Sequence, residues 1–190
     1  MRKFFLCILV LVLLISATYV YSYTAKKVVV YDEKNGVYVP SGWMGDTNAI
    51  KLDNSCTTKP RRGKFCQKWT YSVTGSQRQG WAGVYWQYPP NNWGNKKGYS
   101  LKGLKKLNFW VRGDKGGEVI SIKIGGITGK NSDTMTVDLG KKRLSTDWRE
   151  YTINISGKDL SSVSGGFCWA VDSKDNPEGC VFYFDEIIYE

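Results

Sequence analysis

The chain has 190 residues, of which 42% are apolar and 14% aromatic, with 27 Lys and Arg against 17 Asp and Glu. It contains no histidine, which excludes Ser-His-Asp and Cys-His catalytic arrangements, and its cysteines lack the C-x-x-C spacing of common zinc sites. The formal net charge of +10 favours an anionic partner such as an acidic polysaccharide, whereas the scattered positions of the charges argue against nucleic acid.

Residues 1–22 have the layout of a secretory signal peptide. Two basic residues precede an apolar run over residues 4–15, and small and polar residues follow it. The run is short for a membrane span, which needs about 20 residues. We therefore expect cleavage after Ala17 or Ser22 and a secreted or extracytoplasmic protein, whereas an uncleaved segment would serve as an anchor. Residues 23–190 are long enough for one domain, which we expect to be a monomer.

Short runs rich in Val, Ile, Tyr, Phe and Trp alternate along the chain with clusters of Gly, Asn, Asp, Ser and Lys. This pattern predicts an all-β protein, an antiparallel β-sandwich or barrel. A single helical turn is expected only over residues 156–162. We expect strands over residues 27–31, 49–52, 67–73, 83–87, 106–112, 119–124, 134–138, 149–155, 166–171 and 181–189.

Aromatic residues are densest in the run GWAGVYWQYPPNNWG over residues 80–94. Side chains alternate between the two faces of a strand, so Trp81, Tyr85 and Gln87 share a face toward solvent while the more apolar residues between them face the core. Trp93 follows on a loop rich in Pro and Asn, where it would form a rim or plug the end of the sandwich. Trp and Tyr serve both in cores and at interfaces, so a structural role for each ring stays open.

The strand expected over residues 106–112 has an apolar core face and, opposite it, a polar and aromatic face with Trp110 and Arg112. The strand expected over residues 119–124 turns its isoleucines inward and Ser121 and Lys123 outward. We expect these two strands to pair as a hairpin across the glycine-rich turn between them. Lys123 would then lie near Arg112.

Four cysteines follow the expected signal peptide: Cys56, Cys66, Cys168 and Cys180. An even number of cysteines in an exported chain implies disulfides, and four cysteines allow three pairings. We favour the two local bridges, Cys56 with Cys66 and Cys168 with Cys180, because each would close a polar loop that leads into or joins apolar strands.

Several outward residues match the chemistry of a sugar site. A pyranose ring stacks its C–H face on an aromatic plane, and its hydroxyls need planar hydrogen-bond partners. The candidates for stacking are Trp81, Tyr85, Trp93 and Trp110, and the candidates for hydrogen bonding or for pairing with an acidic sugar are Gln87, Arg112, Glu118 and Lys123.

Six short strings mark strands and loops in chain order: VYD at residues 30–32, SGWMGD at 41–46, GWAGVYW at 80–86, FWVRG at 109–113, WREY at 148–151 and FYFDEI at 182–187. Their order resembles the galactose-binding-like jelly rolls that serve as carbohydrate-binding modules, over nearly all of residues 27–190. The resemblance implies a jelly-roll sandwich that binds carbohydrate, although the same fold hosts protein-binding and enzyme-associated domains.

The resemblance also implies a structural calcium ion. In many modules of this type the Asp of the closing strand binds calcium together with oxygens from the loop after the first strand, and calcium needs six to eight oxygens. The matching positions nominate Asp185 and Asp46, with Asp32 or Asp53 as further ligands. Glu186 stands where the family often has a second aspartate, which leaves the ligand set open. Loop carboxylates that cap Lys or Arg are the alternative.

We expect polysaccharide binding without catalysis. Glycoside hydrolysis needs two carboxylates that face each other across the sugar, and no spacing in the chain pairs two of them. A polysaccharide lyase acting on an acidic glycan is the enzymatic alternative, with Tyr85, Arg112 and Lys123 as its parts. A protein-interaction module on the cell surface is a third hypothesis, in which the exposed aromatic rings would form the core of an interface.

Overall fold

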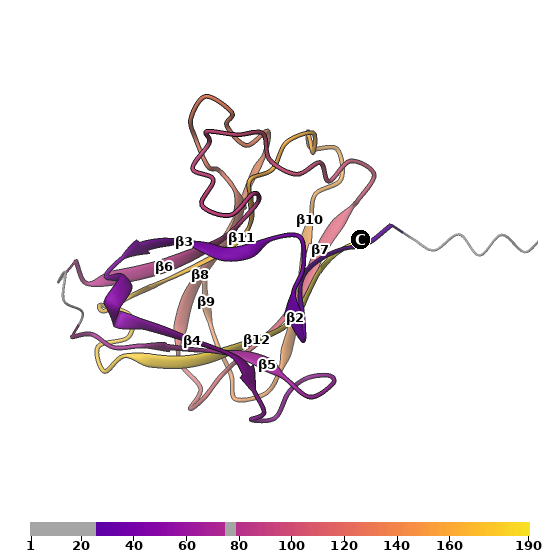
Figure 1. The fold of residues 1–190 in the computed structure, drawn as a ribbon. Helices are drawn as coiled ribbons and strands as arrows, with labels where there is room; N and C mark the ends of the chain where they lie inside the picture. Colours follow the sequence, from indigo (N-terminus) through magenta and orange to yellow (C-terminus); the bar gives the residue numbers. More distant parts are fainter. Residues whose placement is uncertain (1–25, 75–78) are drawn as a thin grey trace, which may run out of the picture.

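The computed structural model describes residues 26–74 and 79–190, so the expected signal peptide lies outside the described residues. The described chain forms two antiparallel sheets packed face to face, which confirms the predicted β-sandwich (Figure 1). Its elements are β1 (Val28–Asp32), β2 (Lys34–Asn35), β3 (Val39–Gly45), the 3-10 helix η1 (Thr47–Ala49), β4 (Ile50–Cys56), β5 (Cys66–Tyr71), β6 (Trp81–Gln87), β7 (Lys106–Gly113), β8 (Val119–Gly125), β9 (Thr136–Arg143), β10 (Arg149–Asn154), β11 (Gly165–Asp172) and β12 (Cys180–Tyr189).

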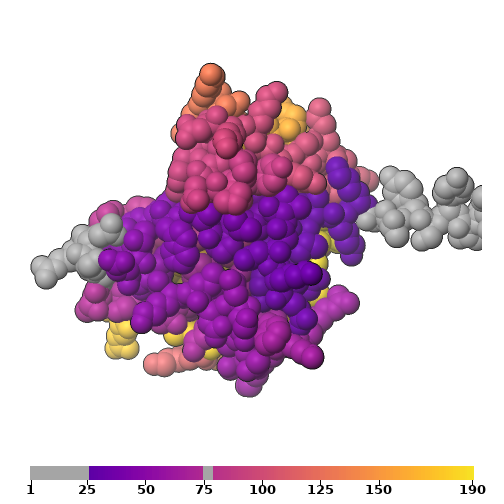
Figure 2. Space-filling view, in the orientation of Figure 1, coloured from indigo at the N-terminus to yellow at the C-terminus, as the bar shows by residue number. Residues whose placement is uncertain are grey.

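One sheet has five strands in the order β3-β6-β11-β8-β9. The other has seven: β10-β7-β12-β1-β2 run side by side, and β12 also pairs with β5, which pairs with β4. The connections β6–β7, β8–β9 and β10–β11 gather at one end of the sandwich, at the top of Figure 1. Figure 2 shows them as a raised mass above the strands.

The core between the sheets is dominated by aromatic rings. The ring of Trp69 on β5 lies 4.7 Å from that of Trp169 on β11 and 5.5 Å from that of Trp86 on β6, centre to centre. All three rings are fully buried and meet edge to face, the arrangement that aromatic pairs prefer. The prediction that the face of β6 bearing Trp86 points inward is thus confirmed.

The ten predicted strands are all present, with their ends shifted by a few residues. Sequence reasoning missed β2 and β3. The sequence of β3, VPSGWMG, contains residues that disfavour strands, yet β3 is an edge strand, where proline is tolerated. The expected turn over residues 156–162 is not helical, and among the described residues no helix is long and apolar enough to span a membrane.

The expected hairpin between β7 and β8 is wrong. Strand β7 pairs with β10 and β12 in one sheet, whereas β8 pairs with β11 and β9 in the other. The turn between them crosses from sheet to sheet, and its backbone instead bonds the segment before β10: Gly113 N–H donates to the Ser145 carbonyl and Gly117 N–H to the Leu144 carbonyl. As a result, the outward faces of β7 and β8 lie on opposite sides of the sandwich.

All four described cysteines are free thiols, and burial raises the pKa of Cys66, Cys168 and Cys180 to about 12. The bridge between Cys168 and Cys180 is wrong. Cys168 lies on the outward face of the five-stranded sheet, whereas Cys180 belongs to the other sheet, and packed sheets are about 10 Å apart. Cys56 and Cys66 are buried register partners on β4 and β5, so their bridge stays a prediction for oxidising conditions.

Candidate functional site

The outward face of the five-stranded sheet has a row of small side chains at its centre. Gly83 on β6 pairs with Ala170 on β11, which pairs with Ser121 on β8. Met44 on β3 and Lys141 on β9 stand at the two ends of this row, as the register partners of Gly83 and Ser121. Register partners share a face, so longer side chains enclose a low centre. We call these five residues the trough.

Trp81 borders the trough at the start of β6, where its side chain is 36% exposed. A small cavity of about 170 Å³ opens beside it and is also lined by Ser121, Lys141 and Asp172. Lys141 forms an ion pair with Asp175 at 2.6 Å. An aromatic plane therefore lies next to a hydroxyl, an ammonium group and carboxylates, the groups that stack on a sugar ring and bond its hydroxyls.

Tyr85, Lys123 and Trp93 border the trough on its other side. The Lys123 ammonium lies 5.3 Å from the centre of the Tyr85 ring, and the Trp93 ring meets that ring edge-on at 6.0 Å. Trp93 is 42% exposed but Tyr85 only 3%, and the Tyr85 hydroxyl donates to the Gly125 carbonyl at 3.2 Å. Burial raises the pKa of Tyr85. The predicted stacking role of Tyr85 is therefore wrong, and this ring instead supports Trp93 and Lys123.

The loop that presents Trp93 is fixed by two buried amides. The Asn92 side chain donates to two carbonyl groups and to the Ser164 hydroxyl, and its oxygen accepts two backbone N–H groups of the loop. Gln87 donates to the Asn92 carbonyl at 3.1 Å and accepts from the Ser41 hydroxyl at 2.9 Å. Gln87 is fully buried, so the prediction that it faces solvent and bonds sugar is wrong. It holds the loop instead.

Trp110 and Arg112 lie on the outer face of the seven-stranded sheet, and the β4–β5 loop, residues 57–65, covers them. The Arg61 guanidinium lies 4.1 Å from the centre of the Trp110 ring. Arg112 is 5% exposed and donates to the Thr58 carbonyl at 2.8 Å. The prediction of one binding face that includes both residues is therefore wrong, because they lie on the side of the sandwich opposite the trough.

Glu118 also lies away from the trough. It is 8% exposed in the turn between β7 and β8, and its Oε1 accepts the Lys115 N–H at 2.7 Å. The prediction that it joins the sugar site is wrong, because that turn crosses between the sheets.

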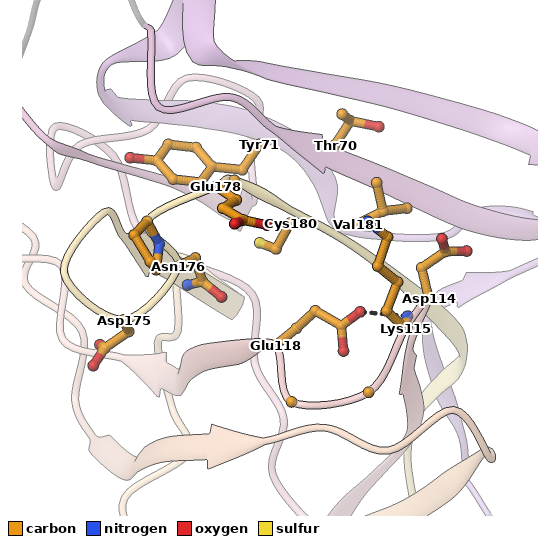
Figure 3. A pocket seen from close by; sticks show the side chains of 14 residues that line it. Thr70, Tyr71, Asp114, Lys115, Glu118, Asp175, Asn176, Glu178, Cys180 and Val181 are labelled. Carbon is orange, nitrogen blue, oxygen red and sulfur yellow. Dashed lines mark hydrogen bonds between the residues drawn. The ribbon is translucent and has the colours of Figure 1, made fainter.

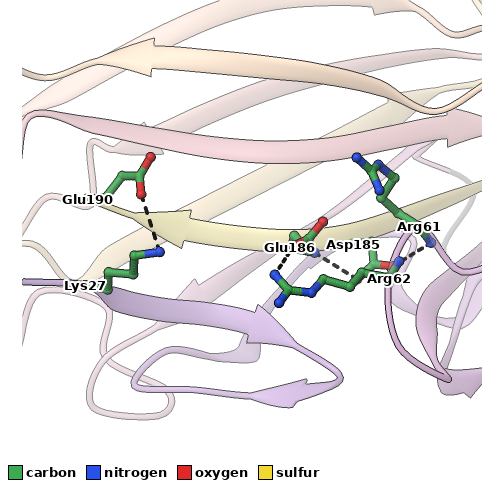
Figure 4. A network of polar contacts seen from close by, with 6 residues as sticks. All are labelled: Lys27, Arg61, Arg62, Asp185, Glu186 and Glu190. Atoms are coloured by element: carbon green, nitrogen blue, oxygen red, sulfur yellow. Dashed lines mark hydrogen bonds and ion pairs between the residues drawn. The ribbon is translucent and has the colours of Figure 1, made fainter. Parts of the chain in front are cut away.

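The carboxylates nominated for calcium do not form one site. Asp46 accepts two backbone N–H groups from residues 79–80, both at 2.8 Å. Asp185 accepts two from residues 61–62, at 2.8 and 3.2 Å (Figure 4). Asp53 accepts a neighbouring backbone N–H in the same way. Within the described ranges no three acidic or thiol side chains are close enough to hold a metal ion. N–H donors occupy the carboxylates of Asp46, Asp53 and Asp185, and Asp32 belongs to no such group of three side chains in the described ranges, so the four residues do not fit a shared calcium site.

The buried carboxyl of Asp185 predicts a dependence of stability on pH. Burial raises the pKa of this carboxyl to about 6, even though three backbone N–H groups lower it. The folded state therefore holds a proton more tightly than the unfolded state, whose Asp pKa is about 3.9. This extra stability is complete below the unfolded pKa and is lost as the pH rises through about 6.

We expect the free energy of unfolding to fall by about 1–3 kcal/mol between about pH 4 and pH 6.5, relative to the Asp185→Asn variant. The amide keeps an oxygen for the loop N–H groups and removes the charge, so the difference between the two proteins isolates this one group. Urea unfolding at several pH values measures it. Parallel pH profiles for the two proteins would contradict the assignment.

Sequence reasoning missed all five trough residues as ligand contacts. Ser121 was placed correctly on an outward face but given no role, and Met44 lies on the strand that was not predicted. Ala170 and Lys141 join Ser121 only through pairing across β11, β8 and β9. The available signal was a small outward residue on each of β6, β8 and β11. It gains meaning only once the strand order is known, because only then do the three residues lie side by side.

No family model matches the chain, and no curated protein matches it. Two similar solved structures are a family 30 carbohydrate-binding module and the family 30 carbohydrate-binding module of a cellulosomal cellulase of Clostridium thermocellum. Each has 16% sequence identity, with TM-scores of 0.53 and 0.51; the alignments cover 87% of this chain and 88% and 97% of those chains. The described chain therefore has the β-sandwich fold of these carbohydrate-binding modules.

Proposed function

We propose that this protein is an exported carbohydrate-binding module without catalysis of its own, and that it holds a polysaccharide chain in the trough. The observation that carries the proposal is the position of two exposed rings, Trp81 and Trp93, on opposite sides of a low floor of small side chains. The floor lets sugar rings approach the sheet closely, while the two rings offer stacking surfaces. The signal-peptide layout of residues 1–22 supports export.

Polar groups along one side of the trough favour a polar or anionic sugar. Lys123 makes no ion pair with any described residue; the ion pairs in the described part of the chain are made by Lys27, Arg62, Lys106 and Lys141. Its register partner on β9 is Asp138, whose carboxylate accepts the Gly140 N–H. An ammonium group held over a ring and left without a carboxylate partner suits a uronic acid or a dense set of hydroxyls.

The three residues named for the lyase alternative do not form one site in the structure. The Tyr85 hydroxyl is buried against a backbone carbonyl, and Arg112 lies on the other side of the sandwich from Lys123. A base and its charge-stabilising partner must both reach the same sugar. Binding alone is therefore the better-supported function.

Retention on insoluble polysaccharides tests the proposal. The domain is mixed with neutral and acidic polymers at low and high salt, and the supernatant is assayed for new reducing or unsaturated ends. Binding without new ends is the expected result. Released ends would show that the protein is an enzyme. Binding to none of the polymers would contradict carbohydrate binding.

Lys123→Gln should weaken retention on acidic polymers by up to about fivefold at low salt, with little change on neutral ones, because an exposed ion pair contributes about 0.2–1 kcal/mol. The loss should shrink as salt screens the charge. Lys158→Gln, at an exposed lysine in the β10–β11 connection, is the matched control. An equal loss in both variants would show that net charge, and not Lys123, governs the binding.

A further inference from the structure

Three connections at one end of the sandwich bond to one another and form a loop cap, the raised mass in Figure 2. Asn131 joins the first two: its N–H donates to the Gly94 carbonyl, and its side chain donates to the Asn95 carbonyl. Tyr99 and Val163 form a β-bridge between the first connection and the third. The backbone of the loop cap is therefore held in one arrangement. Its segments are residues 88–105, 126–135 and 155–164.

The loop cap is strongly basic. It carries six exposed lysines against two acidic residues, Asp133 and Asp159. Asp133 accepts three backbone N–H groups, and Asp159 accepts that of Ser161, so both carboxylates already bond the fold. None of the six lysines forms an ion pair with a described residue. They are Lys96, Lys97, Lys102, Lys105, Lys130 and Lys158.

Three of these lysines surround the exposed ring of Trp93. Lys96 lies in the same turn as Trp93, which the Asn92 side chain closes, and Lys97 follows in the chain. Lys130 belongs to the neighbouring turn, which bonds the Trp93 turn. We call Lys96, Lys97 and Lys130 the lysine cluster. It borders the same side of the trough as Trp93.

The other three lysines lie at the edge of the seven-stranded sheet. Lys105 donates its N–H to the Glu190 carbonyl after β12, and its carbonyl accepts the Ile155 N–H after β10. Lys102 precedes Lys105 on this segment, and Lys158 donates its N–H to the Ile155 carbonyl. These lysines have the same charge and exposure as the lysine cluster, but they do not border the trough. They therefore provide a matched control.

The opposite border of the trough, beside Trp81, has acidic walls. Asp172 and Asp175 line the small cavity there, and Asp175 also lines a cavity of about 420 Å³ between the β7–β8 turn, the β11–β12 connection and β5 (Figure 3). Three further acidic residues line this larger cavity: Asp114, Glu118 and Glu178. The basic residues that line the two cavities are Lys115 and Lys141, and Lys141 pairs with Asp175 at 2.6 Å. An anionic chain is thus repelled at the Trp81 border and attracted at the Trp93 border.

We infer that the glycan held in the trough is an acidic polysaccharide, and that its carboxylate-bearing sugars pass Trp93 and pair with the lysine cluster. The inference rests on the proposed function of the trough, and it adds the substrate class and the place of the charged units. Lysine carries a point charge on a flexible stem, so separate lysines suit a row of carboxylates along a chain better than one small anion. Lys123, also without an ion pair among the described residues, continues this row toward the trough.

The test uses three uronic-acid polymers, pectate, alginate and hyaluronate, each beside its methyl-esterified form. The ester keeps the sugar backbone and removes the charge. Affinities are measured by titration calorimetry at pH 7, where an ordinary carboxyl is ionised, in low and in high salt. At least one polymer should bind about tenfold more tightly as the acid than as the ester, because three or four exposed ion pairs contribute about 1.4- to 5-fold each. The difference should shrink at high salt.

Two triple variants locate the charged units. Replacing the lysine cluster by glutamine, in Lys96→Gln/Lys97→Gln/Lys130→Gln, should weaken binding of the acid at least fivefold and change binding of the ester less than twofold. The control Lys102→Gln/Lys105→Gln/Lys158→Gln loses the same charge and should change both less than twofold. Equal losses of acid binding in the two variants would show that net charge governs affinity, and would overturn the inference.

The remaining outcomes separate this inference from the proposed function. Equal affinity for acid and ester would overturn the acidic substrate class and leave the trough proposal intact. Trp81→Ala should weaken binding of acid and ester by the same factor, which tests the trough alone. Polyglutamate is a polyanion without sugar rings, and its binding as tightly as the best uronate would overturn the assignment of a sugar chain. Binding of no polymer in either form would overturn both proposals.

Discussion

Trp81→Ala should lower the affinity for the retained polysaccharide by about 5- to 150-fold. The substitution removes one of the two exposed rings that border the trough, and stacking on an aromatic ring contributes about 1–3 kcal/mol per ring by the measure of base stacking. Because much of the ring is already exposed, the free energy of unfolding should change by about 1 kcal/mol or less. Titration calorimetry with a soluble oligosaccharide, together with urea unfolding, measures both quantities.

Trp110→Ala is the matched control for this result. Trp110 is also partly exposed and lies on an outward strand face, but on the other sheet and against Arg61. Its removal should leave the affinity unchanged. Lower affinity in Trp110→Ala with normal affinity in Trp81→Ala would place the sugar on the seven-stranded sheet and refute the trough.

Trp86→Ala should reduce the free energy of unfolding by about 3–5 kcal/mol, the usual cost of truncating a buried aromatic ring. Trp86 is fully buried and meets Trp69, Phe167 and Phe184 edge to face across the core. Urea or guanidinium unfolding measures the loss. A loss below about 1 kcal/mol would show that this ring is not in the core.

Trp86→Phe separates packing from polarity at the same position. The indole N–H is buried without a hydrogen-bond partner among the described residues. Phenylalanine keeps a ring in the core and removes that unpaired donor, so the variant should lose much less stability than Trp86→Ala. Equal losses in the two variants would show that the indole N–H makes a bond that stabilises the fold.

The period of two in the sequence predicted individual strands and their faces well, because side-chain alternation is a local property. It separated Trp81 from Trp86 on β6 correctly, one exposed and one buried. Strand pairing is not local. The glycine-rich turn after β7 reads as a hairpin, yet its backbone bonds residues 144–145 and carries the chain to the other sheet. Because of that one error, Arg112 and Lys123 were predicted to be neighbours.

A side chain that points outward from its strand is not always exposed to solvent. Tyr85 and Gln87 point outward from β6 as predicted, but the loop that follows β6 and the β8–β9 connection bury them. Asp133 binds the backbone N–H groups of Ile127, Ser164 and Gly165, and so ties the β8–β9 connection to the start of β11. Contacts over such sequence separations leave no periodic signal, so the covered part of the candidate site could not be predicted from the sequence.

The central claim is that sugar binds on the outward face of the five-stranded sheet, and mapping of amide shifts tests it most directly. The labelled protein is titrated with a soluble oligosaccharide of the polymer that retains it. Shifts should concentrate at Gly83, Ser121 and Ala170 and at the indole N–H groups of Trp81 and Trp93. Shifts confined to Asn108, Trp110 and Thr152, on the outward face of β7 and β10, would contradict the account.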